Sequence, residues 1–419
     1  MDLFEIDPDA IEAAIDDRLI DHCGDAELAT AVSRVLARPR TTTNSFTLHA
    51  PLELMARARL LPRVSDGRRT GARARLVALA AIYDHSGEPV DAPDAPPPTT
   101  VDGAVDLLRS AIGDRDAEAA DRAAIALGRL VTPAQLARML ADDVVPLLGA
   151  AGHAPIALTQ WPQVDLAPLD GGIIRHLLRE LAAEGDLRFR LDHPSGVRQP
   201  GSSDELAAAL AAPMPMGHPG FGVFLLIDQA ERHDALAAFP GIDEGAVAGA
   251  FRLVLRRAAN AMLTDDTRAA PYGWSHALTL PLALAQLSGH LSDATVALDA
   301  AITEWCGFRM AHGRNAVVDY DPAPSSIELA TALATSPDVA AAAAWHHPRP
   351  DEAVQLLIDN AASSHDAHLV KYTVASLDAM AFDQRHQRLY LAAAAFLAGW
   401  WRRHPAHDDP LPGLATGDS

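Results

Sequence analysis

Four histidines in apolar, helix-forming surroundings are the residues of this sequence best suited to chemistry. They are His49 in SFTLHAPLELMA, His153 in LLGAAGHAPIAL, His276 in YGWSHALTLPLALA and His368 in SSHDAHLVKYTVASL. Taken singly, a buried histidine is more often a core residue satisfied by a carbonyl than a ligand. Neutral imidazoles from distant helices can nevertheless converge on one metal ion. Four such residues together therefore predict a buried metal site.

Lys371 is the only lysine among 34 lysine and arginine residues, and it follows His368 by three positions. On a helix this spacing places both side chains on one face. A desolvated amine can lose its proton and react with carbon dioxide to form a carbamate, an oxygen ligand, whereas a guanidinium stays charged. Positions three or four from some histidine cover about a sixth of the chain by ordinary helix geometry, so coincidence stays an alternative.

Other polar and aromatic residues surround these histidines in the sequence. His365 precedes His368 by three positions, so HDAH could supply two ligands from one helix. We instead assign His365 and Asp366 to the surroundings of the metal, as candidate catalytic residues that relay protons. Three aromatic residues could wall a pocket for a flat apolar substrate, although ordinary core packing is the better explanation for each. They are Trp161, Tyr272 and Trp274.

The elements that must position these residues are predicted to be helices. Alanine and leucine dominate, and apolar residues recur every three or four positions, as in DAEAADRAAIALGRLV and DEAVQLLIDNAA. A hydrophobic content of 49% is ample for one large core. We predict an all-α fold, a large bundle-like single domain with long loops and little or no sheet. The catalytic domain is expected to span residues 1–403, and residues 404–419 to form a disordered tail.

Proline and glycine interrupt the helical pattern at three places. We expect a surface loop at 88–100 and irregular loops at 191–204 and 213–222, which could frame a pocket entrance. Ser203 or Asp204 is expected to cap the helix that follows the second loop. Only 187–191 and 221–227 have plausible β character.

Composition and missing motifs exclude several classes of protein. A net charge of −21 without a basic cluster argues against nucleic acid as a partner. No G-x-G-x-x-G follows a strand and no phosphate-binding loop or G-x-S-x-G elbow occurs, so neither a nucleotide cofactor nor a hydrolase elbow is predicted. The apolar run at 391–401 is too short to cross a membrane, which needs about 20 residues. With an acidic N-terminal segment unlike a secretory signal and two unpaired cysteines, Cys23 and Cys306, we expect a cytoplasmic protein with reduced thiols.

The histidine segments together resemble the questin oxidase-like family. LHAPLE, GHAPI, YGWSHALTL and DAHLVKY occur in this order and span residues 49 to 372, most of the chain. The resemblance implies a helical fold and the oxidation of polycyclic aromatic polyketides by ring cleavage or a Baeyer–Villiger-like reaction. It also implies Fe(II) held by His49, His153, His276 and His368, with carboxylated Lys371 as a further ligand. LHAPLE is the loosest match, and the reduced nicotinamide described for some members has no binding motif here.

The sequence therefore predicts a non-haem iron oxygenase that uses O2 on an aromatic or polyketide-type small molecule. Two alternatives stay open. A histidine and carbamylated-lysine site would also suit a metal-dependent hydrolase, although such sites usually belong to strand-rich barrels. A non-catalytic helical interaction protein would have the same alanine-rich composition. The substrate and the oligomeric state are not predicted.

Overall fold

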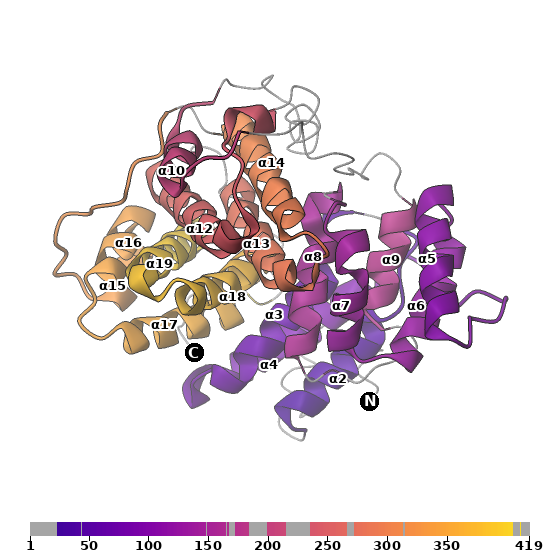
Figure 1. The fold of residues 1–419 in the computed structure, drawn as a ribbon. Helices are drawn as coiled ribbons and strands as arrows, with labels where there is room; N and C mark the ends of the chain where they lie inside the picture. The colour runs from indigo at the N-terminus through magenta and orange to yellow at the C-terminus, as the bar shows by residue number, and fades with distance from the viewer. Residues whose placement is uncertain are drawn as a thin grey trace.

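Helices make up nearly all of the regular structure. The structure is a computed structural model that describes residues 23–42, 44–147, 149–164, 166, 172–183, 199–214, 235–265, 272–312, 315–404 and 411. In its first half the helices are α2 (Asp25–Leu36), α3 (Ser45–Leu60), α4 (Asp66–Asp84), α5 (Val101–Asp114), α6 (Ala117–Leu130), α7 (Pro133–Val144), α8 (Gly149–Gln160) and α9 (Ile174–Ala183) (Figure 1). The later helices are α10 (Ser203–Ala211), α12 (Val247–Thr264), α13 (Tyr272–Leu287), α14 (Ala294–His312), α15 (Leu329–Thr335), α16 (Pro337–Trp345), α17 (Pro350–Ser363), α18 (Ala367–Phe382) and α19 (Gln387–Arg403).

Short 3₁₀ turns extend or join several of these helices. They are η2 (Leu61–Arg63), η3 (Trp161–Gln163), η4 (Ala235–Ala238), η5 (Glu244–Ala246), η6 (Ser288–His290) and η7 (Gln384–His386). The described residues contain no β-sheet, only isolated bridges between Arg40 and Pro89 and between Pro200 and Gly241. The all-α prediction is therefore confirmed.

The apolar spacing and the capping residues explain where the helices form. The two amphipathic segments singled out in the sequence are α6 and α17, whose buried residues repeat at helical spacing. Asp116 caps α6 by accepting hydrogen bonds from the backbone N–H groups of Glu118 at 3.0 Å and Ala119 at 2.9 Å. Pro133 and Pro337 occupy the first turn of α7 and α16, where a missing N–H costs nothing.

The alanine-rich helices α16 and α19 pack unusually close together. At Gly399 a Cβ atom would lie 3.1 Å from Cβ of Ala340 and 3.2 Å from Cα of Pro337. Small side chains therefore set the separation of these two helices. Leu389 to Gly399 are all buried, so the apolar run at 391–401 is a core helix, as predicted. Within the described residues, no helix combines the length and apolar character needed to span a membrane.

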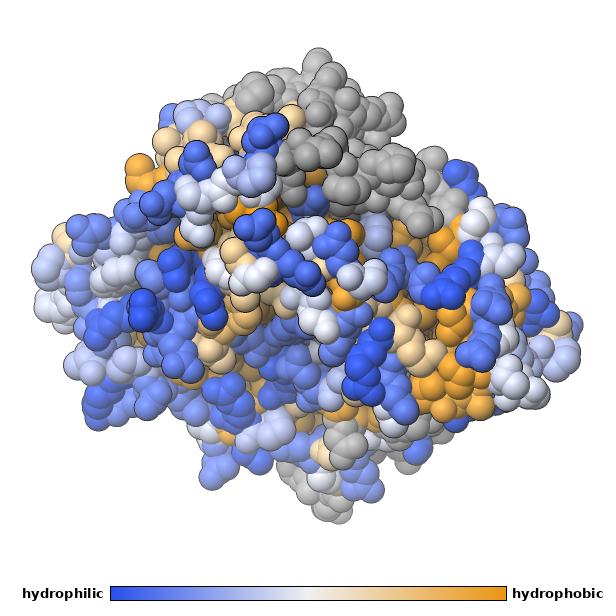
Figure 2. All heavy atoms as spheres, in the orientation of Figure 1, coloured by the Kyte–Doolittle hydropathy of each residue, from blue (hydrophilic) through white to orange (hydrophobic). Residues whose placement is uncertain are grey.

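Four helices from distant parts of the sequence close into a ring. α3 packs against α8, α8 against α13, α13 against α18, and α18 against α3. In Figure 1 α3 and α8 come from the indigo-to-magenta half of the chain, and α13 and α18 come from the orange-to-yellow half. We call α3, α8, α13 and α18 the four-helix ring. Around it, much of the surface visible in Figure 2 is hydrophilic.

The predicted loops are described only in part. Residues 88–100 are irregular, as predicted, and join the body through Thr41 N–H to Glu88 O at 2.9 Å and Val90 N–H to Pro39 O at 2.7 Å. The helix after the second loop is capped by Ser202, so the expected cap at Ser203 or Asp204 is wrong. The Ser202 hydroxyl accepts a hydrogen bond from Glu205 N–H, and the Glu205 carboxylate accepts one from Ser202 N–H at 2.7 Å.

Several predictions fall on residues that the structure does not describe. The two candidate strands, 187–191 and 221–227, lie outside the described residues. Most of the two irregular loops, 191–198 and 215–222, and most of the predicted tail do so as well.

Candidate metal centre

The four histidines predicted to bind metal lie on the four-helix ring, one on each helix. His49, His153 and His276 are each the fifth residue of their helix, and His368 is the second residue of α18. His153 is buried, whereas the other three are half-buried rather than fully buried as the sequence predicted. The ring therefore gathers residues from four separate segments at the N-terminal ends of their helices.

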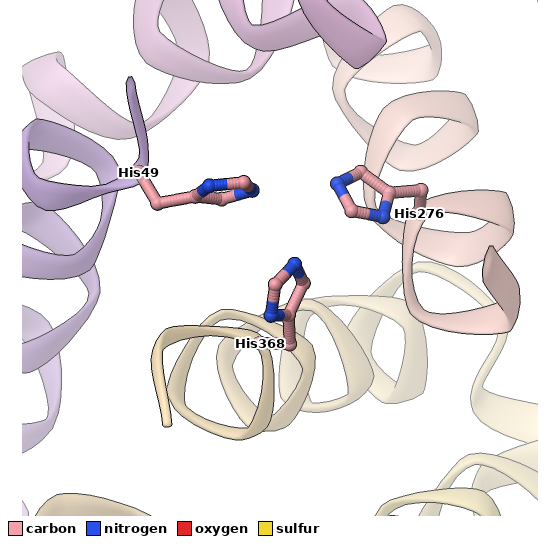
Figure 3. A group of neighbouring side chains, drawn as sticks. All are labelled: His49, His276 and His368. Atoms are coloured by element: carbon pink, nitrogen blue, oxygen red, sulfur yellow. The ribbon is translucent and has the colours of Figure 1, made fainter. Parts of the chain in front are cut away.

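Three of these imidazoles face a common space. The ring centroids of His49 and His368 are 4.6 Å apart, those of His276 and His368 5.2 Å, and those of His49 and His276 6.0 Å. One nitrogen from each ring lies within 4.8 Å of the other two, and Figure 3 shows the three side chains pointing toward one another. Metal–nitrogen distances of about 2.0–2.1 Å place ligand nitrogens roughly 3–4 Å apart, so small side-chain rotations would bring this set to coordination distance.

His153 lies beside this trio but is not one of its members. Its ring centroid is 4.7 Å from that of His49 and 6.1 Å from that of His276. The side chain is buried, and neither ring nitrogen has a hydrogen-bond partner among the described residues. Buried polar groups are rarely left unbonded. His153 is thus a candidate fourth ligand or a contact for a bound molecule.

A backbone carbonyl fixes the orientation of His49. Its Nδ1 lies 2.5 Å from the carbonyl oxygen of Ser45, one turn earlier on α3, so Nδ1 carries the proton and donates it to that oxygen. The lone pair is then on Nε2, which is buried and has no hydrogen-bond partner among the described residues. This arrangement is typical of a metal ligand whose second nitrogen is held by a carbonyl.

Asp366 contacts both the N-terminus of α18 and the side chain of His368. Its side chain caps α18 by accepting from Leu369 N–H at 2.9 Å, and Oδ2 lies 3.6 Å from Nδ1 of His368. Burial raises the pKa of Asp366 to about 6, although hydrogen bonds from the backbone and the charge of Lys371 oppose the rise. The separation of 3.6 Å is longer than a hydrogen bond, so Asp366 acts on His368 through its charge, and we infer that Nε2 of His368 is the nitrogen for a ligand bond.

His365 does not share a helical face with His368. Helix α18 begins at Ala367, so His365 lies in the turn before it and is not part of the close trio. The idea that HDAH supplies two ligands from one helix is therefore wrong. The charge of His365 does act on Asp366 and lowers the pKa of that carboxyl. The role predicted for it in the surroundings of the metal stays a prediction.

Lys371 is buried next to the histidines. Only 4% of the residue is exposed, and burial lowers the pKa of its ammonium to about 7, while Asp366 and Glu53 oppose the shift. Burial lowers the pKa of His49, His153 and His368, and the positive charge of Lys371 lowers each of them further. His368 and Lys371 are both on α18, three positions apart, as the spacing predicted.

Two arginines of α3 join it to α17 and α18. Buried Arg57 pairs with Glu53 on the same helix and donates to the carbonyls of Ala362 in α17 at 3.0 Å and of Ser364 in the turn before α18 at 2.7 Å. Two residues later, half-buried Arg59 binds both carboxylate oxygens of Asp378 on α18 at 2.7 and 2.8 Å. A bidentate charged contact restricts sliding of one helix along the other. The pair of Arg59 and Asp378 therefore restrains the two helices that carry His49 and His368.

A glycine controls how closely α8 approaches α13. Gly152, directly before His153, has φ of +67°, and a Cβ atom there would lie 2.3 Å from Cδ2 of Leu280. Only glycine takes this backbone conformation without strain. The glycine in GHAPI thus serves to place His153, a role that the sequence motif alone did not reveal.

The aromatic side chain that contacts the trio is one that the sequence analysis did not single out. Phe308 on α14 stacks on His276 with centroids 6.1 Å apart and ring planes 14° apart. Trp274 is buried against Trp305, at 6.1 Å, and Trp161 is buried in η3. The side chain of Tyr272 is outside the described residues. Antiparallel packing of α13 and α14 brings Phe308 to His276, which local sequence patterns do not indicate.

Glu304 is a second residue near this contact that was not predicted. It precedes Phe308 by one helical turn on α14, and neither carboxylate oxygen has a hydrogen-bond partner among the described residues. Burial raises the pKa of Glu304 well above its usual value. The favoured form is the neutral acid, which can donate a hydrogen bond inside the core.

Comparison with protein-family models, with curated proteins and with solved structures finds no match. The resemblance to the questin oxidase-like family therefore stays a prediction from the four histidine segments, and the functional argument rests on this chain's own residues.

Proposed function

We propose that this chain is an oxidoreductase, a non-haem iron oxygenase that acts with O2 on an aromatic or polyketide-type small molecule. The observation that supports this most is the approach of three histidine nitrogens, from α3, α13 and α18, to within 4.8 Å of one another beside buried Lys371. The resemblance of the same segments to questin oxidase-like proteins suggests the reaction class, ring cleavage or Baeyer–Villiger-like oxidation.

The donor set fits a first-row transition metal. Imidazole nitrogens suit iron, zinc and copper, and they bind only in the neutral form. Burial and the charge of Lys371 lower the pKa of His49, His153 and His368, so these rings are neutral at pH 7. Nε2 of His49, held by the bond from Nδ1 to Ser45, and Nε2 of His368, opposite Asp366, would be ligand atoms, with one nitrogen of His276 as the third.

Charge balance favours an anionic form of Lys371. Neutral imidazoles leave the charge of a divalent ion uncompensated, and a nearby ammonium would repel it. With a pKa of about 7, much of the amine is unprotonated at neutral pH. Nζ can then attack the carbon of CO2, forming an N–C bond and releasing one proton, which leaves a carbamate anion. Its oxygens would both compensate the metal charge and add a ligand.

The protein residues around the metal have separate tasks in this proposal. Ferrous iron, when bound, would supply the electrons that dioxygen activation requires. Asp366 lies beside the ring of His368 and, with a pKa of about 6, can accept or release a proton near pH 7. Phe308 supports the ring of His276 from one side. The four-helix ring limits the access of water to the reacting groups.

Elemental analysis of anaerobically purified protein tests the proposal. Wild type should contain about one iron per chain, and His276→Ala and His368→Ala should lose it, while exposed His290→Ala on η6 should not. Loss of iron in His153→Ala would show that the fourth histidine is also a ligand. Zinc in place of iron would favour the hydrolase, and no retained metal would favour the interaction protein. If iron is present, oxygen uptake with aromatic polyketides identifies substrates.

A further inference from the structure

A second candidate binding site lies far from the histidines. The structure contains a cavity of about 550 Å³ where the end of α18, η7 and the start of α19 meet α12 and the end of α16. Met380, twelve positions beyond His368 on α18, lines it, and at about 1.5 Å per residue some 18 Å of helix separates the two sites. Cavities of this size suit small molecules. We call it the arginine pocket.

Positive charge is concentrated in this pocket although the chain as a whole is acidic. Four arginines and one aspartate line it, in a protein of net charge −21. Arg256 is held by Asp383 at 2.6 and 2.9 Å, and Arg257 by Asp319 at 2.7 Å. The charge of Asp338 acts on Tyr320 in the pocket wall, so four guanidinium groups stand against three carboxylates, which leaves an excess of positive charge. A local field of this sign attracts anions.

Two of these arginines are available to a ligand. Arg385 on η7 is exposed and forms no ion pair within the described part of the chain. Arg388 donates from Nη1 to the carbonyl of Trp345 at 2.5 Å, which positions its guanidinium at the pocket rim without neutralising it. Guanidinium groups bind carboxylate, sulfate and phosphate groups through paired hydrogen bonds. Helix α19 also begins here, at Gln387, with no side-chain cap on its N-terminus, and its dipole adds to the field.

Aromatic rings form another wall of the same pocket. The rings of Tyr320 and Trp345 meet edge to face with centroids 5.5 Å apart, and both residues are half-buried. Asn260 holds the Tyr320 segment by accepting from Tyr320 N–H at 2.8 Å. Aromatic faces and edges of this kind bind planar groups.

We propose that the arginine pocket binds a small aromatic anion, with the acid group at Arg385 and Arg388 and the flat ring against Tyr320 and Trp345. The charge excess accounts for the anion, the aromatic wall for the planar group, and the volume for a single small molecule. This proposal does not depend on the metal centre, because the lining residues of the pocket include none of the four histidines or Lys371.

Calorimetric titration of the full chain with naphthoate tests this inference, with naphthamide and inorganic phosphate as comparison ligands. Naphthoate should bind at one site per chain, and both comparison ligands should bind about tenfold or more weakly. Arg385→Glu should weaken naphthoate binding by about tenfold or more. The matched charge reversal Arg138→Glu, at an exposed position of α7, should leave it unchanged. Binding to Arg385→Glu that equals wild type would overturn the proposal.

The comparison ligands and one further variant separate the remaining explanations. Equal binding of naphthamide would mean an apolar surface, and equal binding of phosphate a simple anion site, and either result would overturn the aromatic-anion assignment. Failure of naphthoate to bind at millimolar concentration would also overturn the aromatic-anion assignment. His368→Ala should bind naphthoate like wild type. If that variant lost binding, the ligand would belong to the histidine cluster and not to the arginine pocket.

Discussion

Oδ2 of Asp366 lies 3.6 Å from Nδ1 of His368, and the same carboxyl group caps the helix that carries His368 and Lys371. One side chain thus caps the first turn of α18 and places a carboxyl group beside a candidate ligand on it. A residue with two tasks can be tested by a substitution that removes only one of them.

Asp366→Asn should keep the cap and remove the charge. Asparagine caps helices about as well as aspartate, so the free energy of unfolding should change little. Metal affinity should fall by about 10- to 100-fold, the usual effect of losing a group that orients a ligand. Metal content after dialysis against a chelator measures this. Asp116→Ala, which removes the cap of α6, should cost about 1 kcal/mol of stability and leave metal content unchanged. Full metal retention in Asp366→Asn would contradict the orienting role.

Lys371→Arg should abolish the lysine chemistry while retaining a positive charge. A guanidinium cannot form a carbamate, so we expect metal content and oxygen uptake to fall by about tenfold or more. Lys371→Ala should regain part of both when short carboxylates such as formate are added, because they can occupy the vacated ligand position. Unchanged metal content and activity in Lys371→Arg would show that the carbamate is not needed.

Gly152→Ala should disturb the placement of His153. A left-handed backbone costs an alanine about 1–2 kcal/mol, and the added Cβ would meet Leu280. Chemical denaturation should show this loss, together with lower metal content if His153 is a ligand. Gly113→Ala on α5, where a Cβ has open space, is the matched control and should be neutral or stabilising by up to about 1 kcal/mol. Equal stability of the two variants would disprove the strain argument.

Asp121→Ala should be among the most destabilising changes outside the metal centre. Asp121 is fully buried and binds Arg175 through both oxygens at 2.7 and 2.8 Å, which joins α6 to α9. Removing it leaves a buried arginine unpaired, at a cost of about 3–5 kcal/mol. Asp143→Ala breaks a similar pair with Arg109, whose side chain is 53% exposed, and should cost less than about 1 kcal/mol. Thermal and urea unfolding would compare them, and a small effect at Asp121 would argue against a locked α6–α9 pair.

Asp383 should make folding stability depend on pH in the acid range. Burial alone would raise the pKa of Asp383, but hydrogen bonds and charge from Arg256 and His386 outweigh it and lower the pKa below 3.8. A carboxyl whose pKa is lower in the folded state stabilises the protein above the unfolded value and loses this contribution as pH falls through the folded value. The difference in unfolding free energy between wild type and Asp383→Asn should therefore be constant above about pH 5 and shrink below 3.8. A difference that grows on acidification would have the wrong sign.

The helical class could be predicted because local spacing determines it. The apolar periodicity of α6 and α17 follows from 3.6 residues per turn, and it needs no knowledge of the neighbours. Caps were less certain: Ser202, Ser203 and Asp204 are all good capping residues, and the choice of Ser202 depends on its reciprocal bonds with Glu205. The boundary of α18 was misjudged in the same way. This helix begins at Ala367, so His365 precedes it and does not lie on its face.

The candidate metal centre could be predicted only as a set of residue types. Apolar surroundings identified the four histidines, and composition identified Lys371. Which three rings come closest depends on the order of helices around the ring, and no local pattern encodes that order. Phe308 and Gly152 were missed for the same reason. Their roles come from contacts of α14 and α8 with α13, made between residues far apart in sequence.

The contact that joins α3 to α18 also bears on how the protein is made. Arg59 and Asp378, which join the helices of His49 and His368, are 319 positions apart. During translation, at about 5–20 residues per second, the N-terminal half emerges many seconds before its partner helices exist. The nascent chain therefore exposes His49 and His153 before His276 and His368 exist, so under the proposed function metal would be loaded late, after the last helices have folded.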